Sequence, residues 1–120
     1  MTLLFAVLMI STSSIFAQNA INERFESVSN EEFKEALETG DYILLDVRTV
    51  EEYSAGNIEG AKLLDFNGEH FDQALADMPK DHKYLIYCAS GTRSKLAMEK
   101  MKETGFKYVL ELDNGFNGWE

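Results

Sequence analysis

Cys88 is the only cysteine of the chain, and its surroundings are those of a reactive thiol. It follows an apolar run, residues 84–87, that predicts a buried strand, and a short turn, residues 89–92, comes after it. Arg93, Ser94 and a helical pattern as far as Thr104 follow the turn. A thiol at a helix N-terminus meets free backbone N–H groups and the positive end of the helix dipole, which both favour the thiolate. Such settings lower the pKa of a cysteine from about 8.5 to roughly 3.5–7.5, so the segment predicts a nucleophilic sulfur.

The alternative is that Cys88 fills space in the core, as most free cysteines do. A filler does not require a glycine three residues later, Gly91, or a guanidinium five residues later, Arg93. In α/β proteins, ligands bind beyond the carboxyl ends of the strands, which is where Cys88 lies in this prediction. We therefore interpret Cys88 as a functional residue.

Composition predicts a single acidic globular domain. The chain has 120 residues, of which 45% are hydrophobic and 12% aromatic, enough for one core. Its formal net charge is −10, which argues against nucleic acid and anionic membrane surfaces as partners. We expect a monomer.

The first residues resemble a secretory signal peptide. Residues 3–10 are an unbroken apolar run, too short to span a bilayer, and a small residue, Ala17, follows a serine- and threonine-rich stretch. No Lys or Arg precedes the run, and Ile15 stands where a small residue is usual, which are departures from the pattern. We expect residues 1–17 to be removed, residues 18–120 to form one domain, and the protein to be secreted or periplasmic. No cysteine lies just after the apolar run, so we expect no lipid anchor. A lone thiol in an oxidising compartment needs protection or a purpose, which again favours a function for Cys88.

Short strands and helices alternate along the rest of the chain. Two capping boxes, Ser29-x-x-Glu32 and Thr49-x-x-Glu52, predict helix starts, and Asn67 could cap a third helix. The predicted strands are residues 25–28, 42–47, 58–64, 84–88 and 108–112, and the predicted helices are residues 30–38, 50–53, 68–77 and 94–104, with a closing turn at 115–119. This alternation predicts an α/β fold, with a mainly parallel sheet of about five strands and helices on both faces.

Four segments, in this order, resemble the rhodanese-like domain family over about residues 25–120. They are Leu45-Asp46-Val47-Arg48 followed by Glu51-Glu52-Tyr53, then Gly56-Asn57-Ile58-Glu59-Gly60-Ala61, then Tyr87-Cys88-Ala89-Ser90-Gly91-Thr92-Arg93-Ser94, and last Leu112-Asp113-Asn114-Gly115-Phe116-Asn117-Gly118-Trp119. The second is similar to the family's Gly-His-Ile-Pro-Gly-Ala and the fourth to its Gly-Gly-Phe-x-x-Trp. Asn57, Glu59 and Asn114 depart from these patterns, and none of them lies in the thiol loop.

The resemblance implies a sulfurtransferase that needs no metal and no cofactor. The Cys88 thiolate would take the outer sulfur of a small donor, such as thiosulfate or a persulfide, and pass it to a thiol or to cyanide. The loop residues Ala89, Ser90, Gly91, Thr92, Arg93 and Ser94 would bind the anionic sulfur through their N–H groups. Gly91 would let the loop curl, and Arg93 would orient an anionic donor or brace the loop.

Two charged residues, Asp46 and Arg48, lie at the end of a neighbouring predicted strand. We expect them to form a salt bridge that supports the loop from below. The alternative is an ion pair that contributes little to stability. The two histidines, His70 and His82, lie far from the motif in sequence, and we expect both on the surface. One cysteine and two scattered histidines do not have the spacing of a metal site.

Two other functions remain open at this point. Cysteine phosphatases also place a thiolate and an arginine around a helix N-terminus, but with the spacing Cys-x5-Arg, whereas Cys88 and Arg93 have the spacing Cys-x4-Arg. The shorter loop suits one sulfur atom better than a tetrahedral phosphate. A rhodanese-like interaction module without catalysis is the other alternative, although such modules commonly lack the cysteine.

Overall fold

The structure, a computed structural model, describes residues 21–120 and contains a five-stranded sheet. The predicted signal peptide therefore lies outside the described residues. Every strand pairs in parallel with its neighbours, in the order β1-β5-β4-β2-β3, so the predicted parallel sheet is confirmed. The strands are β1 (Arg24–Val28), β2 (Tyr42–Asp46), β3 (Lys62–Leu63), β4 (Lys83–Tyr87) and β5 (Tyr108–Leu112).

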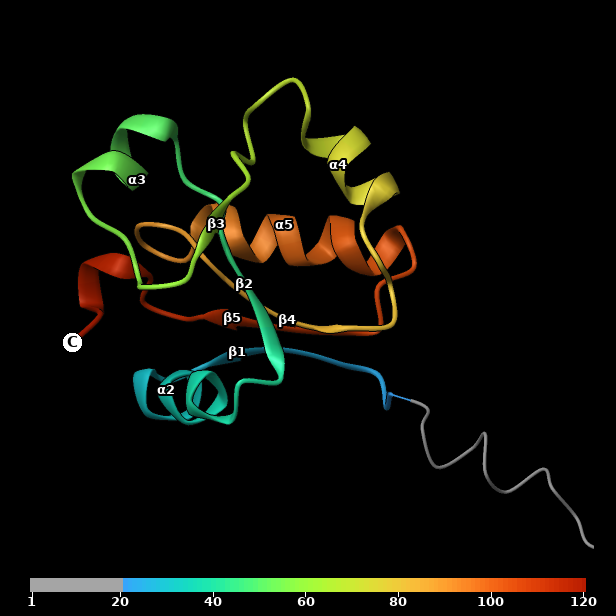
Figure 1. Ribbon diagram of the computed structural model, residues 1–120, viewed down its shortest axis with the longest axis horizontal. Helices are drawn as coiled ribbons and strands as arrows, with labels where there is room; N and C mark the ends of the chain where they lie inside the picture. The colour runs from blue at the N-terminus through green and yellow to red at the C-terminus, as the bar shows by residue number, and fades with distance from the viewer. Residues whose placement is uncertain (1–20) are drawn as a thin grey trace, which may run out of the picture.

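Helices cover both faces of the sheet (Figure 1). One face packs on α2 (Asn30–Thr39), and the other packs on α4 (Phe71–Asp77) and α5 (Thr92–Glu103). The short helix α3 (Val50–Ala55) and the 3-10 turn η1 (Phe116–Gly118) lie toward the carboxyl ends of the strands (Figure 1). No helix in residues 21–120 has the length and apolar character needed to cross a membrane.

The central strand β4 explains why its sequence is an unbroken apolar run. Tyr84 and Ile86 pack in the cluster beneath α4 and α5, while Leu85 and Tyr87 pack in the cluster above α2. Successive side chains of a strand point to opposite faces, so a strand covered on both faces is apolar at every position. The same alternation directs Cys88, the next residue, toward α5.

Two predicted elements are shorter in the structure. The strand predicted at residues 58–64 forms only at Lys62–Leu63, because a turn precedes it: the Ala61 N–H donates to the Ile58 carbonyl at 3.0 Å. The helix predicted at residues 68–77 begins at Phe71, and Asn67 does not cap it. Instead, the Asn67 N–H donates to the Asp65 carboxylate at 2.9 Å, in a turn typical of aspartate.

The predicted helix boundaries are otherwise close. Ser29 and Thr49 both cap their helices, but the reciprocal carboxylate bond exists only at Thr49, because the Glu32 carboxylate accepts a bond from Arg24 at 2.8 Å. Helix α5 begins at Thr92 instead of Ser94, which places Ser94 within the first helical turn. Its backbone N–H is thus one of the four that have no partner inside the helix.

Candidate active site

Cys88 lies between the last residue of β4 and the first turn of α5. Its sulfur accepts hydrogen bonds from the backbone N–H groups of Gly91, at 3.1 Å, and Ser94, at 3.4 Å. The Ser94 hydroxyl oxygen is also 3.4 Å from the sulfur. The residue is buried, with 1% of its surface exposed. The strand and the helix thus hold the thiol against a ring of N–H donors.

These donors lower the pKa of the Cys88 thiol. Burial alone raises this pKa, because it disfavours the charged thiolate. Hydrogen bonds from the backbone N–H groups of Ser94, Gly91 and Ser90 act in the opposite direction, and the net effect is a lowered pKa. The net shift favours the thiolate, which is the nucleophilic form.

The structure brings part of the predicted loop to the sulfur and directs the rest elsewhere. The N–H groups of Ser90, Gly91 and Ser94 face it. Ala89 instead uses its carbonyl to accept a bond from the Asn117 N–H at 2.9 Å, and Thr92 is exposed on the first turn of α5. Binding of a donor by these residues stays a prediction.

The segment after β5 packs directly on the thiol loop. The Phe116 N–H donates to the Cys88 carbonyl at 2.8 Å. Gly91 has φ +97°, and a Cβ atom there would overlap the carbonyl oxygen of Asp113. A Cβ atom at Gly115 would overlap the carbonyl group of Ala89. Glycine is therefore required on both sides of this contact, which ties the loop to the end of the sheet.

The Arg93 guanidinium is held by Glu52 of α3. Its two terminal nitrogens lie 2.7 and 2.9 Å from the two carboxylate oxygens, a bidentate pair. The hydrogen bonds from Arg93 lower the pKa of Glu52 to about 2. Of the two roles considered for Arg93, this is the bracing arrangement. Sequence reasoning placed Glu52 in a capping box and in a segment that resembles the family, but it did not predict the contact with Arg93, since nothing in the sequence shows that α3 and α5 meet here.

Replacing Glu52 with glutamine should lower the free energy of unfolding by about 1 kcal/mol at neutral pH, a value discounted because the carboxylate is 32% exposed. The pKa of about 2 lies below the ordinary value of 4.5, so the stabilisation is present above pH 4.5 and disappears as the pH falls through about 2. Urea unfolding at a series of pH values would show the two proteins converging in acid. Glu51→Gln, on the exposed side of the same helix, is the matched control. A difference that stays constant from neutral pH to acid would contradict this account.

Asp46 and Arg48 form a buried ion pair, as expected. The Arg48 Nη2 and Asp46 Oδ2 atoms are 2.7 Å apart, and Asp46 is fully buried. The Asp46 carboxylate also accepts a bond from the Tyr87 hydroxyl at 2.8 Å, and Arg48 lies 4.4 Å from the centre of the Phe116 ring. The pair thus contacts the residue before Cys88 and the closing turn instead of the sulfur.

A second buried network reaches the sulfur, and sequence reasoning missed it. Glu111 of β5 is fully buried, and its Oε2 accepts a bond from the Ser94 hydroxyl at 2.6 Å. Lys95 Nζ lies 3.0 Å from the other oxygen, but the angle is poor for a hydrogen bond, so Lys95 contributes charge more than a directed bond. A signal was available: Glu111 is a charged residue inside an otherwise apolar strand.

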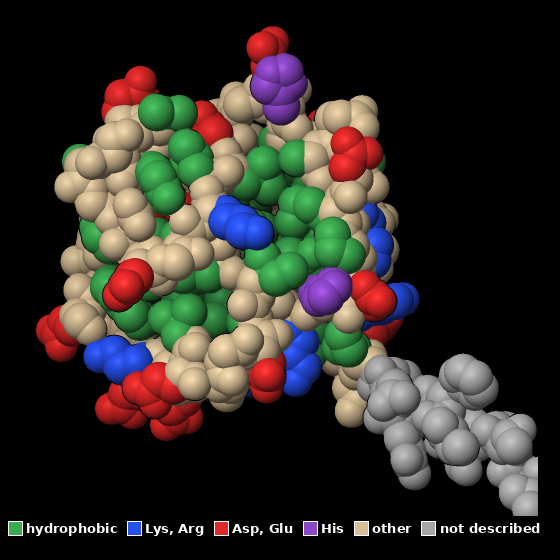
Figure 2. All heavy atoms as spheres, in the orientation of Figure 1, with side chains coloured by type: hydrophobic (Ala, Val, Ile, Leu, Met, Phe, Trp, Pro, Cys, Tyr) green, Lys and Arg blue, Asp and Glu red, His purple; other side chains and the backbone are tan. Residues whose placement is uncertain are grey.

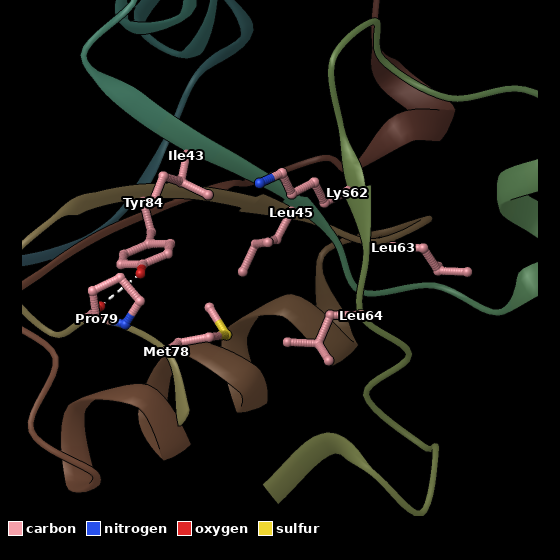
Figure 3. A pocket seen from close by; sticks show the side chains of 8 residues that line it. All are labelled: Ile43, Leu45, Lys62, Leu63, Leu64, Met78, Pro79 and Tyr84. Carbon is pink, nitrogen blue, oxygen red and sulfur yellow. Dashed lines mark hydrogen bonds between the residues drawn. The ribbon is translucent and has the colours of Figure 1, made fainter. Parts of the chain in front are cut away.

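One cavity in the described part of the chain is lined by residues outside the thiol loop. It measures about 330 Å³ and lies among β2, β3 and the loop after α4, where Ile43, Lys62, Met78 and Tyr84 line it (Figure 3). Figure 2 shows hydrophobic side chains gathered on the face that carries α4, broken by one basic side chain. No residue of the predicted thiol site lines this cavity.

The two histidines lie on the surface, as expected, with side chains 89% and 55% exposed for His70 and His82. In residues 21–120, no three His, Cys, Asp or Glu side chains are grouped so that they could hold a metal ion.

Comparison with known proteins agrees with this geometry. The family model for the rhodanese-like domain matches residues 29–120. The thiosulfate sulfurtransferase GlpE of Pseudoalteromonas translucida is 32% identical over 97 residues, which cover 80% of this chain and 90% of GlpE. The protein named "Probable adenylyltransferase/sulfurtransferase MoeZ" of Mycobacterium tuberculosis is 30% identical over 94 residues, which cover 78% of this chain. The chain spans only 24% of MoeZ.

Among solved structures, the rhodanese-like domain protein of Staphylococcus aureus superposes with a TM-score of 0.70 at 30% identity. The match covers 79% of this chain and 91% of that protein. The parallel α/β fold, the position of Cys88 and these relatives lead to one conclusion: this chain belongs to the rhodanese-like domain family.

Proposed function

We propose that the protein is a sulfurtransferase that moves a sulfane sulfur through a persulfide on Cys88. The observation that carries the proposal is the ring of N–H donors, with Gly91 and Ser94 at 3.1 and 3.4 Å from the sulfur. Such a ring stabilises a thiolate and, after transfer, the negative charge of a persulfide. The name of the relative GlpE supports thiosulfate as the donor.

In the first half-reaction, the Cys88 thiolate attacks the outer sulfur of thiosulfate. A sulfur–sulfur bond forms to Cys88, the original sulfur–sulfur bond breaks, and sulfite leaves with the electron pair. In the second half-reaction, cyanide or an acceptor thiolate attacks the terminal sulfur, and Cys88 leaves as the thiolate. The covalent intermediate divides one transfer into two easier steps.

The geometry favours sulfur over phosphate as the transferred group. The loop from Cys88 to Arg93 has four intervening residues, one fewer than in cysteine phosphatases. Its N–H groups converge on the sulfur atom itself, and Arg93 is engaged by Glu52. A tetrahedral phosphate would need a wider ring of donors and a guanidinium directed at the ligand.

The second candidate is an interaction module without catalysis. Two observations favour it: Cys88 is only 1% exposed, and both terminal nitrogens of Arg93 are already bound. A catalytic Cys88 requires that the loop admits a donor to the sulfur.

An assay of thiocyanate formation from thiosulfate and cyanide separates these candidates. We expect steady turnover by the purified protein and no hydrolysis of an aryl phosphate under the same conditions. Absence of thiocyanate would favour the interaction module, and efficient phosphate hydrolysis would favour the phosphatase.

A further inference from the structure

The proposed mechanism does not use the buried carboxylate of Glu111. A single side chain, that of Ser94, lies between this carboxylate and the reacting sulfur. The Glu111 side chain, fully buried, accepts a hydrogen bond from the Ser94 hydroxyl at 2.6 Å. The same hydroxyl oxygen is 3.4 Å from the sulfur of Cys88. Ser94 itself is fully buried, so water does not compete for either contact.

The Ser94 hydroxyl has only one hydrogen, so it can serve only one of these neighbours. The bond to a carboxylate is charge-assisted, and its length of 2.6 Å is that of a strong O–H···O⁻ bond. The contact with the sulfur is longer, at 3.4 Å, and there the thiol donates to the hydroxyl oxygen. Ser94 therefore presents a lone pair to Cys88, an arrangement that suits the thiol and opposes the thiolate.

The surrounding charges add to this opposition. Lys95 is the cation nearest Glu111, but it is 45% exposed and is shared with Asp113, also at 3.0 Å. The Arg93 charge is balanced by Glu52. A thiolate beside the Glu111 carboxylate would place two negative charges in a buried site that shares one cation, which disfavours the thiolate. The charged groups around the thiol are Glu52 on α3, Asp65 before α4, Arg93 and Lys95 on α5, Glu111 on β5 and Asp113 after it.

We propose that Glu111 is a positioning residue for Cys88: it holds the single hydrogen of the Ser94 hydroxyl away from the sulfur and so limits how readily the thiol ionises. The inference rests on the proposed function in taking Cys88 as the reacting sulfur. The N–H groups of Gly91 and Ser94 favour the thiolate, and Glu111 restrains it.

Such a restraint suits a sulfur that must both attack and leave. A more acidic thiol leaves more readily, but its thiolate is a weaker nucleophile. Cys88 attacks the donor in the first half-reaction and leaves in the second. Glu111 thus makes the thiolate, once formed, a stronger nucleophile and a poorer leaving group.

Glu111→Gln is the variant that releases the hydrogen. Lys95 Nζ lies 3.0 Å from Oε1, so the amide carbonyl of the glutamine should face Lys95. The amide NH₂ then occupies the position of Oε2 and donates to the Ser94 oxygen. Ser94 must accept this bond, and its own hydrogen becomes free to point at Cys88.

The rate of alkylation of Cys88 by iodoacetamide, measured against pH, tests the proposal. In Glu111→Gln the midpoint should fall by about one pH unit, which is roughly tenfold more thiolate below the midpoint. The limiting rate at high pH should fall about threefold, because the less basic thiolate is a weaker nucleophile. Glu99→Gln, an exposed carboxylate on α5, removes the same charge and should leave the wild-type curve unchanged.

Ser94→Ala gives a second readout, and its measurement in the wild-type background does not depend on the folding of the glutamine variant. In the wild-type background it should leave the midpoint unchanged or slightly lower, because the hydroxyl hydrogen does not serve the sulfur and the lone pair that opposes the thiolate is lost. In the Glu111→Gln background the same change should raise the midpoint by about one unit, because the released hydrogen is then lost. A merely structural role for Glu111 would not produce this dependence on background.

Two results would overturn the proposal. The first is an alkylation midpoint in Glu111→Gln that is unchanged or higher. The second is a higher midpoint in Ser94→Ala alone, because it would show that the hydroxyl already donates to the sulfur. Alkylation requires no sulfur donor, so this test is independent of turnover. A shifted midpoint in a protein that forms no thiocyanate would support the Glu111 restraint and refute the proposed function.

Discussion

Replacing Cys88 with serine should reduce thiocyanate formation to the uncatalysed rate. No other cysteine exists in the chain to carry the sulfur, and a serine hydroxyl is not ionised near neutral pH. The fold should survive, because serine is close in size to cysteine and keeps contact with Gly91 and Ser94. We expect a stability change of about 1 kcal/mol, which thermal unfolding would measure. Turnover that persists in this variant would show that Cys88 is not the sulfur carrier.

Replacing Gly91 with alanine should damage both the fold and the activity. The residue has φ +97°, and an added Cβ atom would overlap the Asp113 carbonyl oxygen, which belongs to the backbone and cannot turn aside. We expect a loss of at least about 2 kcal/mol in the free energy of unfolding. Because the Gly91 N–H donates to the sulfur, a displacement of about 1 Å should also cost roughly 100-fold in sulfur transfer.

Gly105→Ala is the matched control for this variant. Gly105 has nearly the same φ, +99°, but no atom lies within 4 Å of the position of an added Cβ. It should show the conformational cost of about 1–2 kcal/mol and retain sulfur transfer. Equal effects of the two substitutions, in urea unfolding and in thiocyanate formation, would mean that the contact with Asp113 does not hold the loop.

Most of the sheet could be predicted from the sequence because its signals are local. The apolar runs that became β2, β4 and β5 are covered on both faces, and the caps at Ser29 and Thr49 mark helix starts. Gly105 follows α5 with φ +99°, a conformation that favours glycine, and its N–H donates to the Lys102 carbonyl at 3.2 Å. The position of Cys88 between β4 and α5 followed from the same local pattern.

The partners of the loop could not be predicted, because they depend on how distant elements meet. Arg93 and Glu52 are 41 positions apart, and Ser94 and Glu111 are 17 apart. Their pairing requires the strand order that places β5 beside β4 and α3 beside the start of α5. The shortening of β3 had a similar cause, since the Ile58 N–H donates to the hydroxyl of Tyr87, a residue 29 positions away, instead of joining the sheet.

The central claim is that Cys88 accepts a sulfur atom, and mass spectrometry of the intact protein tests it most directly. After incubation with thiosulfate and removal of the excess, we expect the mass to increase by one sulfur atom, located on the peptide that contains Cys88. Cyanide should then restore the original mass and release thiocyanate. A protein that folds, exposes its thiol to alkylation and still gains no sulfur from thiosulfate or from a low-molecular-weight persulfide would contradict the proposed function.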